Sequence, residues 1–182
     1  MKIIDNFLSK EELEILQNTI IFGEDFPFYL RSHLNNTDEE SPIWNWYGSH
    51  LVYENSHEHI HHHIVYNHTN KGRIGITDKS YYNLIWNSIF SDKIDYKTLI
   101  RIKTNFYPNT DILREHSPHI DYDFEHAGAV FSLNTCNGYT RIEGKEVDSI
   151  ENRIVFFDGS KPHNSTTTSN AKGRFNINFN FL

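Results

Sequence analysis

The sequence predicts a protein of the α+β class that is mainly β, with helices in its first half and a β-sandwich or barrel in its second half. Its 182 residues are enough for one domain with its own hydrophobic core. From residue 99 onward, short runs rich in β-branched and aromatic residues follow one another, with turn residues between them and without a helical pattern. The last run, residues 174–181, alternates between polar and apolar side chains, which is typical of a strand with two different faces.

The first predicted helix lies in "LSKEELEILQNTI". Ser9 is in place to cap its N-terminus and Glu12 follows three residues later, which is the pattern of a capping box. Leu13, Leu16 and Ile20 recur at helical spacing and predict a buried face.

A second helix is predicted over residues 77–90, "TDKSYYNLIWNSIF", after a less regular stretch. Residues 23–50 contain two prolines and the aromatic cluster "WNWYGSH", so we expect irregular chain or edge strands there. In the second helix Leu84, Ile85 and Ile89 fall on one side, which predicts that the helix packs on a sheet.

Two of the predicted strands carry polar side chains on one face. In the last strand all apolar positions lie on one face and all polar positions on the other. The apolar set is Phe175, Ile177, Phe179 and Phe181, and the polar set is Arg174, Asn176, Asn178 and Asn180. The same alternation puts Arg101, Lys103, Asn105 and Tyr107 on one face of "RIKTNFY". We therefore expect a barrel whose apolar outer face packs on helices and whose polar inner face encloses a polar ligand.

The stretch "EHSPHIDYDF", residues 115–124, contains a candidate metal-binding pair. We expect a strand at "HIDYDF", which would place His119 and Asp121 on one side because residues i and i+2 share a face. His163 follows the predicted strand "RIVFFDG" and a proline-bearing turn, from which its side chain can be directed into the mouth of a barrel. Two histidines and one carboxylate form the facial triad of non-haem Fe(II) sites, which leaves coordination positions open.

Eleven residues after His163 stands Arg174, on the polar face of the last strand. A guanidinium binds a carboxylate through two parallel hydrogen bonds and so fixes its orientation. His116 and His126 lie near the predicted triad, and we expect them at the surface or behind the metal ligands.

Residues 101–182 resemble the iron- and 2-oxoglutarate-dependent dioxygenases, particularly the prolyl 4-hydroxylase-like branch found in phages and bacteria. The matching pieces are "RIKTNFYP", "PHIDYDF", "FSLNTCNGYT", "NRIVFFDGSKPHNS" and "KGRFNINFNF", in the order of the family. The resemblance implies a double-stranded β-helix, or jelly roll, that hydroxylates an unactivated C–H bond with Fe(II), 2-oxoglutarate and O₂, and with ascorbate as a further reductant. It implies that His119, Asp121 and His163 bind iron, that Arg174 binds the distal carboxylate of 2-oxoglutarate, and that Asn105 and Tyr107 lie beside this co-substrate.

A rival motif lies upstream in the histidine-rich stretch His57–His63. "HEHIH" at residues 57–61 satisfies the HExxH pattern of zinc proteases, in which Glu58 would act as general base on a helix. Its flanks "LVYENS" and "HIVYNH" are β-like and no third ligand follows at the longer spacing, so we favour a solvated strand or loop. A lip over the substrate and adventitious nickel binding are the remaining alternatives.

Charge limits the choice of partners. With 17 Lys and Arg against 24 Asp and Glu the formal charge is −7, which disfavours nucleic acid. Nucleobase-repair relatives end in an RxNxxxR pattern, whereas Asn180 stands here at the second arginine. The expected substrate is a peptide or protein residue, with proline as first candidate, or a small molecule. The alternative to an enzyme is a non-catalytic jelly-roll module that serves in binding or assembly.

We expect a single domain over residues 1–182, in which residues 1–98 form a helical and irregular support with a substrate lip and residues 99–182 form the catalytic jelly roll. The oligomeric state is left open, as is whether residues 23–75 form a lid.

Cys136 is the only cysteine, which excludes an internal disulfide and a cysteine-built zinc site. No signal peptide and no run of roughly 18 apolar residues is present, so we expect a cytoplasmic protein, in a host cell if a phage encodes it.

Overall fold

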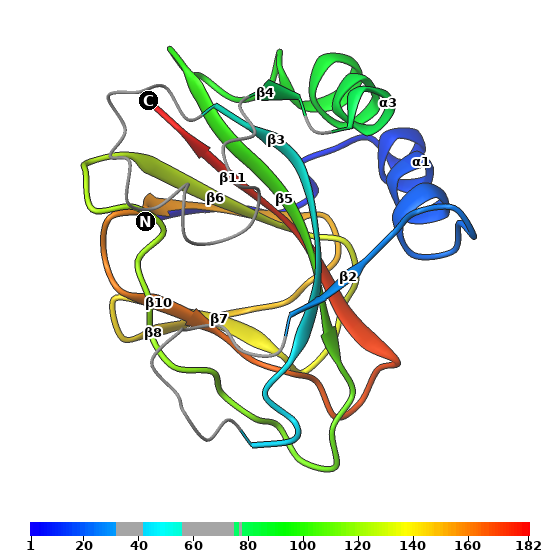
Figure 1. The fold of residues 1–182 in the computed structure, drawn as a ribbon, viewed down its shortest axis with the longest axis vertical. Helices are drawn as coiled ribbons and strands as arrows, with labels where there is room; N and C mark the ends of the chain where they lie inside the picture. Colours follow the sequence, from blue (N-terminus) through cyan, green and yellow to red (C-terminus); the bar gives the residue numbers. More distant parts are fainter. Residues whose placement is uncertain (32–41, 56–74, 77) are drawn as a thin grey trace.

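The computed structural model of the chain describes residues 1–31, 42–55, 75–76 and 78–182. Two antiparallel sheets form most of it (Figure 1). The large sheet has the strand order β1-β9-β6-β11-β5-β3-β2, and β4 pairs with β3 beside this path. Its strands are β1 (Lys2–Ile4), β2 (Tyr29–Arg31), β3 (Tyr47–Glu54), β4 (Gly75–Ile76), β5 (Leu99–Pro108), β6 (Ala127–Ser132), β9 (Arg153–Asp158) and β11 (Gly173–Phe181). The small sheet has the order β10-β7-β8, from β7 (Tyr139–Ile142), β8 (Lys145–Asp148) and β10 (His163–Ser165).

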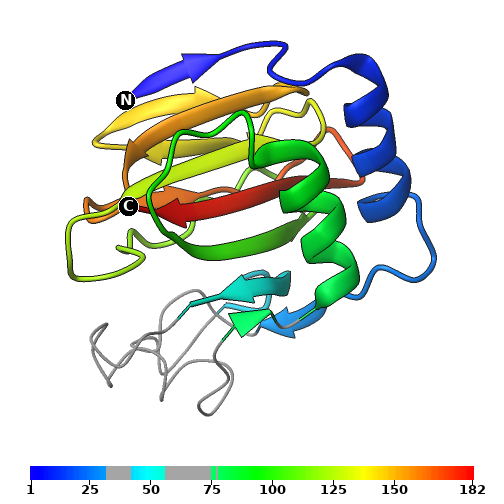
Figure 2. The same cartoon turned by 90° about the horizontal axis from the view of Figure 1, so that it is seen from above.

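Both predicted helices are present on one side of the large sheet (Figure 2). Helix α1 (Lys10–Ile20) begins with the expected capping box, in which Ser9 and Glu12 satisfy each other's backbone amides. The second helix is α3 (Lys79–Tyr82) followed directly by η1 (Asn83–Phe90), and Asp78 caps its start. The pattern indicated this helix at 77–90 but not that η1 is a π-helix, a wider form that is rare in proteins. Within the described ranges, no helix is long and apolar enough to span a lipid bilayer.

The apolar face of β11 packs against these helices, as the alternation predicted. Phe179 is fully buried, with its ring centroid 4.7 Å from that of Phe90 and 5.8 Å from that of Trp86. Ile177 and Phe131 belong to the same core. Burying each of these side chains stabilises the fold by about 1.5–3 kcal/mol, so the helices are held to the sheet by burial of apolar surface.

The polar face of β11 turns the other way, toward the small sheet. Arg174 on β11 donates a hydrogen bond to Oγ1 of Thr140 on β7 at 2.6 Å, so the polar inner faces of the two sheets meet. Asn105 on β5 lies opposite Asn176 on β11 and donates to its Oδ1 at 2.9 Å. This arrangement of two facing antiparallel sheets, in which the helix-covered face of the large sheet is apolar and β5 and β11 turn polar side chains inward, is the expected jelly roll.

The expected strand at "HIDYDF" is not formed. His119 makes only an isolated bridge to His163, and Asp121 lies in a bend. The segment of residues 109–121 instead runs beside residues 159–168, joined by backbone hydrogen bonds such as those in both directions between His119 and His163 at 2.9 Å. The chain here pairs without the regular ladder, because Pro118 cannot donate a backbone hydrogen bond.

Two parts of the support region contribute to the large sheet itself. Strand β1 pairs with β9, and β3 pairs with both β5 and β2. Of the described residues in 23–50, those outside β2 and β3 are irregular, as expected, but β3 is not an edge strand, because it has neighbours on both sides. The histidine-rich stretch His57–His63, with its HExxH pattern, lies outside the described residues.

Candidate metal and carboxylate site

His119, Asp121 and His163 converge at one end of the interior. One ligand atom from each lies within 4.8 Å of the other two. Nε2 of His163 is 3.7 Å from Oδ2 of Asp121, and the two imidazole centroids are 4.6 Å apart. Because bonds from nitrogen or oxygen to a divalent metal are roughly 2 Å long, ligand atoms at these separations can share one ion. The origin of the ligands is the reverse of the prediction, since His163 lies on strand β10 and the other two lie in the irregular segment.

The two imidazoles are prepared to bind a cation. Nδ1 of His163 lies 2.9 Å from the carbonyl oxygen of Lys161, to which it donates when it carries the ring proton, so the lone pair of Nε2 is free. Nε2 of His163 and Nδ1 of His119 are both buried without a hydrogen-bond partner. Burial and the neighbouring His163 lower the pKa of His119 to about 3, which keeps its ring neutral at physiological pH. Buried, unpartnered ring nitrogens beside a carboxylate fit a divalent metal.

The Asp121 carboxylate is oriented by two side chains from the large sheet. Nη2 of Arg101 donates to Oδ1 at 2.5 Å, and Nδ2 of Asn180 donates to Oδ2 at 2.8 Å. Burial alone raises the pKa of Asp121, but the charge of Arg101, with His163 and His119, holds this pKa well below its usual value. Asn180, which replaces the second arginine of the RxNxxxR pattern, thus fixes the carboxylate directly. The sequence placed both side chains on the inner face but did not indicate this contact.

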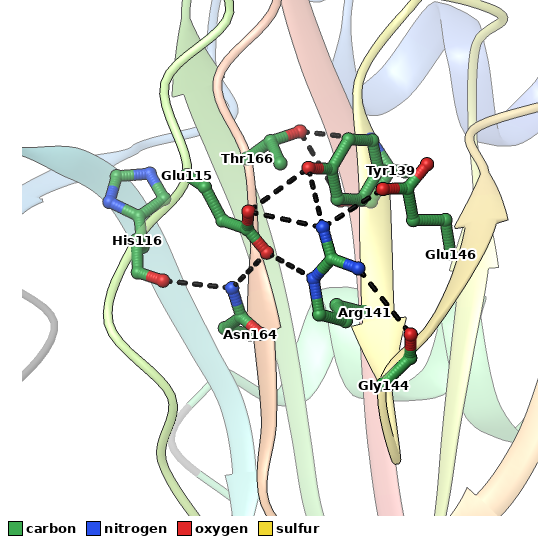
Figure 3. A network of polar contacts seen from close by, with 8 residues as sticks. All are labelled: Glu115, His116, Tyr139, Arg141, Gly144, Glu146, Asn164 and Thr166. Atoms are coloured by element: carbon green, nitrogen blue, oxygen red, sulfur yellow. Dashed lines mark hydrogen bonds and ion pairs between the residues drawn. The ribbon is translucent and has the colours of Figure 1, made fainter.

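The irregular segment that carries two of the three ligands is anchored to the small sheet by a polar network (Figure 3). The carboxylate of Glu115 accepts hydrogen bonds from Arg141 at 2.5 and 3.2 Å and from the hydroxyl of Tyr139 at 3.1 Å. Nδ2 of Asn164 donates both to Glu115 Oε1 and to the carbonyl oxygen of His116, each at 2.8 Å. This network holds the segment next to β10, the strand of the third ligand.

Arg174 is buried on β11 and has no carboxylate partner among the residues that the structure describes. Its side chain donates to the carbonyl oxygen of Thr166 at 3.3 Å and to Thr140 at 2.6 Å, while Nε has no partner. The residue is only 1% exposed. Burial lowers the pKa of its guanidinium, because nothing nearby compensates the charge. A buried cation without a counter-charge is costly, so this position favours an anionic ligand.

Gly138 makes room for the Arg174 side chain. A Cβ atom added to Gly138 would lie 2.7 Å from Cδ of Arg174 and 2.6 Å from the carbonyl oxygen of Thr167. Both separations are too short for a real Cβ contact. The glycine is therefore required by close packing.

Tyr107 and His116 form the remaining wall beside Arg174. The guanidinium carbon of Arg174 lies 5.3 Å from the ring centroid of Tyr107, whose hydroxyl accepts from Oγ of Ser165 at 3.0 Å. His116 packs on Tyr107 with ring centroids 5.5 Å apart, and its Nε2 is buried without a partner. Burial and the charge of Arg174 lower the pKa of His116 to about 4. Asn105 lies next along the same inner face, with its Oδ1 unpartnered.

His116 and His126 were expected either at the surface or behind the metal ligands, and the structure excludes the first of these positions. His116 is 2% exposed and His126 is 6% exposed, so neither lies at the surface. His126 packs against Gly159, where an added Cβ atom would lie 2.3 Å from its Nε2. Both histidines stand in polar, turn-rich stretches, so their sequence context did not decide between the two positions.

Comparison with known proteins yields matches in structure alone. No protein-family model matches the sequence, and no curated protein matches it. A prolyl hydroxylase from Trichoplax adhaerens, solved with a hypoxia inducible factor peptide fragment, has a TM-score of 0.56 at 17% identity, over 99% of this chain and 82% of that chain. A 2OG-Fe(II) oxygenase family oxidoreductase from Burkholderia pseudomallei has a TM-score of 0.57 at 11% identity, over 98% and 82%.

A viral protein gives a similar match over nearly its whole length. The collagen prolyl hydroxylase of Paramecium Bursaria Chlorella virus-1, in its 2OG complex, has a TM-score of 0.52 at 14% identity, over 100% of this chain and 94% of that chain. At these identities the likeness establishes the shared fold. The activity of this chain has to be argued from its own residues.

Proposed function

We propose that this protein is an Fe(II)- and 2-oxoglutarate-dependent dioxygenase that hydroxylates an unactivated C–H bond. The observation that carries the proposal is that the space between the two sheets holds both a group of possible metal ligands and a buried arginine. At one end, His119, Asp121 and His163 offer ligand atoms within 4.8 Å of one another. Toward the other end, Arg174 is buried without a carboxylate partner in the described part of the chain. A dicarboxylate that bridges a metal and a guanidinium satisfies both.

The chain's own residues have distinct parts in this proposal. The triad would hold Fe(II), which when bound supplies the activation of O₂ and the oxidation of the C–H bond. Arg174 would bind the distal carboxylate of 2-oxoglutarate, with Thr140 and Tyr107 fixing the guanidinium. Asn105, on the inner face between these ends, would contact the body of the co-substrate. The buried walls exclude water from the reacting groups.

For the substrate, we propose a peptide or protein residue, with a prolyl residue as first candidate. Support comes from two of the similar structures, which are named as prolyl hydroxylases, one of them in complex with a peptide fragment. A free amino acid or another small molecule would use the same chemistry.

The test is succinate formation from 2-oxoglutarate by the full chain with Fe(II), O₂ and ascorbate, combined with titration of 2-oxoglutarate under anaerobic conditions. We expect binding of 2-oxoglutarate that requires the metal, and slow succinate release that Asp121→Ala abolishes. A protein that binds metal and 2-oxoglutarate without any turnover would instead be a jelly-roll binding module. Absence of metal-dependent 2-oxoglutarate binding would overturn the proposal.

A further inference from the structure

The inner wall beside the metal end carries more positive charge than the candidate iron and 2-oxoglutarate account for. The charge of Arg101 is compensated by its ion pair with Asp121. The side chain of Lys103, the next inward residue on β5, makes no hydrogen bond or ion pair with any described residue, and its ammonium lies over the ring of Tyr47, 5.6 Å from the centroid. Arg31 at the end of β2 donates to Oγ of Ser49 at 3.1 Å and has no carboxylate partner in the described ranges.

These cations belong to one cluster with few anions. Arg31 lies opposite Tyr47 in the register of β2 and β3, and the ammonium of Lys103 lies over the ring of the same Tyr47. Arg31, Arg101, Asp121 and Glu54 all act electrostatically on Lys103. Glu54 is buried and accepts a hydrogen bond from the hydroxyl of Tyr122 at 3.3 Å. Burial, followed by the charge of Arg101, lowers the pKa of Lys103 to about 7, so its ammonium is poorly compensated.

The charge balance of the interior stays positive after the proposed ligands are added. With Lys103 protonated, Arg31, Arg101, Lys103 and Arg174 carry four positive charges, against the two negative charges of Asp121 and Glu54 among the described residues. A divalent metal adds two positive charges and 2-oxoglutarate adds two negative ones, which leaves the excess unchanged. The chain as a whole carries −7, so this local excess opposes the general charge of the protein.

Lys103 stands at a different position along the sheet from Arg174. In the sheet register Arg174 lies opposite Tyr107, whereas Lys103 lies opposite Asn178. Tyr107 comes four positions after Lys103 along β5, so their backbones are roughly 13 Å apart at the usual rise per residue. Lys103 and Asn178, whose buried Oδ1 has no partner, therefore flank the metal end of the interior.

We infer that Lys103 and Arg31 form a second anion-binding position beside the candidate metal centre, and that the substrate carries a carboxylate there. This inference rests on the proposed function and narrows its substrate class to molecules with a carboxylate near the carbon that is oxidised. The C1 carboxylate of 2-oxoglutarate is the other group that reaches this end. It would already have the metal as counter-charge, which leaves Lys103 and Arg31 to the substrate.

The experiment uses the full chain loaded with Mn(II) and 2-oxoglutarate, so that no oxidation occurs. The probes are N-acetyl amino acids, beginning with N-acetylproline. Each is compared with the matching compound whose carboxylate is replaced by a carboxamide, which has the same shape without the negative charge. Binding is measured by calorimetry. A charge-assisted hydrogen bond contributes about 1.5–3 kcal/mol, so we expect at least one acid to bind about tenfold or more tightly than its amide.

Two variants and one control test whether Lys103 and Arg31 cause the preference for the acid over the amide. Lys103→Met, which keeps the length of the side chain, should abolish the preference for the acid, and Arg31→Met should reduce it. Both should leave 2-oxoglutarate affinity within about twofold, and Lys145→Met, at an exposed lysine on β8, should change neither.

The possible outcomes separate the two proposals. If no acid binds better than its amide while 2-oxoglutarate still binds, the inference fails and the proposed function stands. A selective loss of 2-oxoglutarate affinity in Lys103→Met would assign the position to the C1 carboxylate and also overturn the inference. If the unaltered protein does not bind Mn(II) and 2-oxoglutarate, the proposed function itself fails.

Discussion

The guanidinium of Arg101 and the carboxylate of Asp121 form a buried ion pair, with Nη2 of the arginine 2.5 Å from Oδ1 of the aspartate. The pair joins the inner face of β5 to the irregular segment that carries two candidate metal ligands. It gives Asp121 a fixed direction and a counter-charge before any metal binds. A divalent metal at Asp121 would supply the same counter-charge.

Replacing Arg101 with methionine should destabilise the metal-free protein more than the metal-loaded one. Removing one partner of a buried pair leaves an uncompensated charge and typically costs about 3–5 kcal/mol. A divalent ion at Asp121 restores a counter-charge, so saturating Mn(II) should recover much of this loss. Urea unfolding of both proteins with and without Mn(II) measures the difference. Equal destabilisation in both states would show that the metal does not bind at Asp121.

Asp121→Ala should remove measurable Mn(II) binding, because it deletes the only carboxylate of the triad. Calorimetry measures the binding, and far-UV circular dichroism checks that the variant is folded. The matched control is Asp123→Ala, two residues further on, where the aspartate is exposed. If both variants kept the affinity of the original protein, the ion would have to bind elsewhere.

Arg174→Lys should weaken 2-oxoglutarate binding while Mn(II) binding persists. Lysine keeps the charge but loses the planar fork that donates two parallel hydrogen bonds to a carboxylate. We expect a loss of about tenfold to a hundredfold, the effect of one charge-assisted hydrogen bond. Arg153→Lys, at a surface arginine paired with Asp5, is the control. Unchanged 2-oxoglutarate affinity in Arg174→Lys and Arg174→Ala would place the co-substrate away from this arginine.

Gly138→Ala should reproduce the 2-oxoglutarate defect without removing a polar group. The added methyl would overlap Cδ of Arg174, so the guanidinium has to move. Overpacking of this kind costs about 1–3 kcal/mol of stability. The readouts are 2-oxoglutarate affinity, expected to fall, and Mn(II) affinity, expected to stay the same because the triad lies at the other end. A variant with normal 2-oxoglutarate affinity would mean that Arg174 need not hold its position.

Glu115 should make the stability of the fold depend on acid pH. Its hydrogen bonds from Arg141 lower its pKa from 4.5 to about 2 in the folded protein. The unfolded chain therefore binds a proton first as the pH falls, so this stabilisation is complete above about pH 4.5 and is lost as the pH falls toward 2. Glu115→Gln should be less stable than the original protein at pH 6 and approach it at pH 3, in urea unfolding. Glu125→Gln, at an exposed glutamate, should show no such convergence.

Local patterns in the sequence predicted the elements whose cause is local. The capping box of Ser9 and Glu12 starts α1, and the alternation of Phe179 with Asn180 assigns the two faces of β11. These follow from the periods of a helix and a strand, which neighbouring residues alone define. The inward set on β5, including Arg101 and Lys103, follows from the same rule.

Tertiary structure decided what those inward side chains contact. Arg101 and Asp121 are 20 residues apart and Asn180 and Asp121 are 59 apart, so their meeting depends on the path of the whole chain. The same path set His163 on a strand and His119 and Asp121 in an irregular segment, the reverse of the expected origins. Periodicity fixes the direction of a side chain relative to its own strand. Its partner is fixed by which strands pair and in which register, and that depends on burial and hydrogen bonding summed over both sheets.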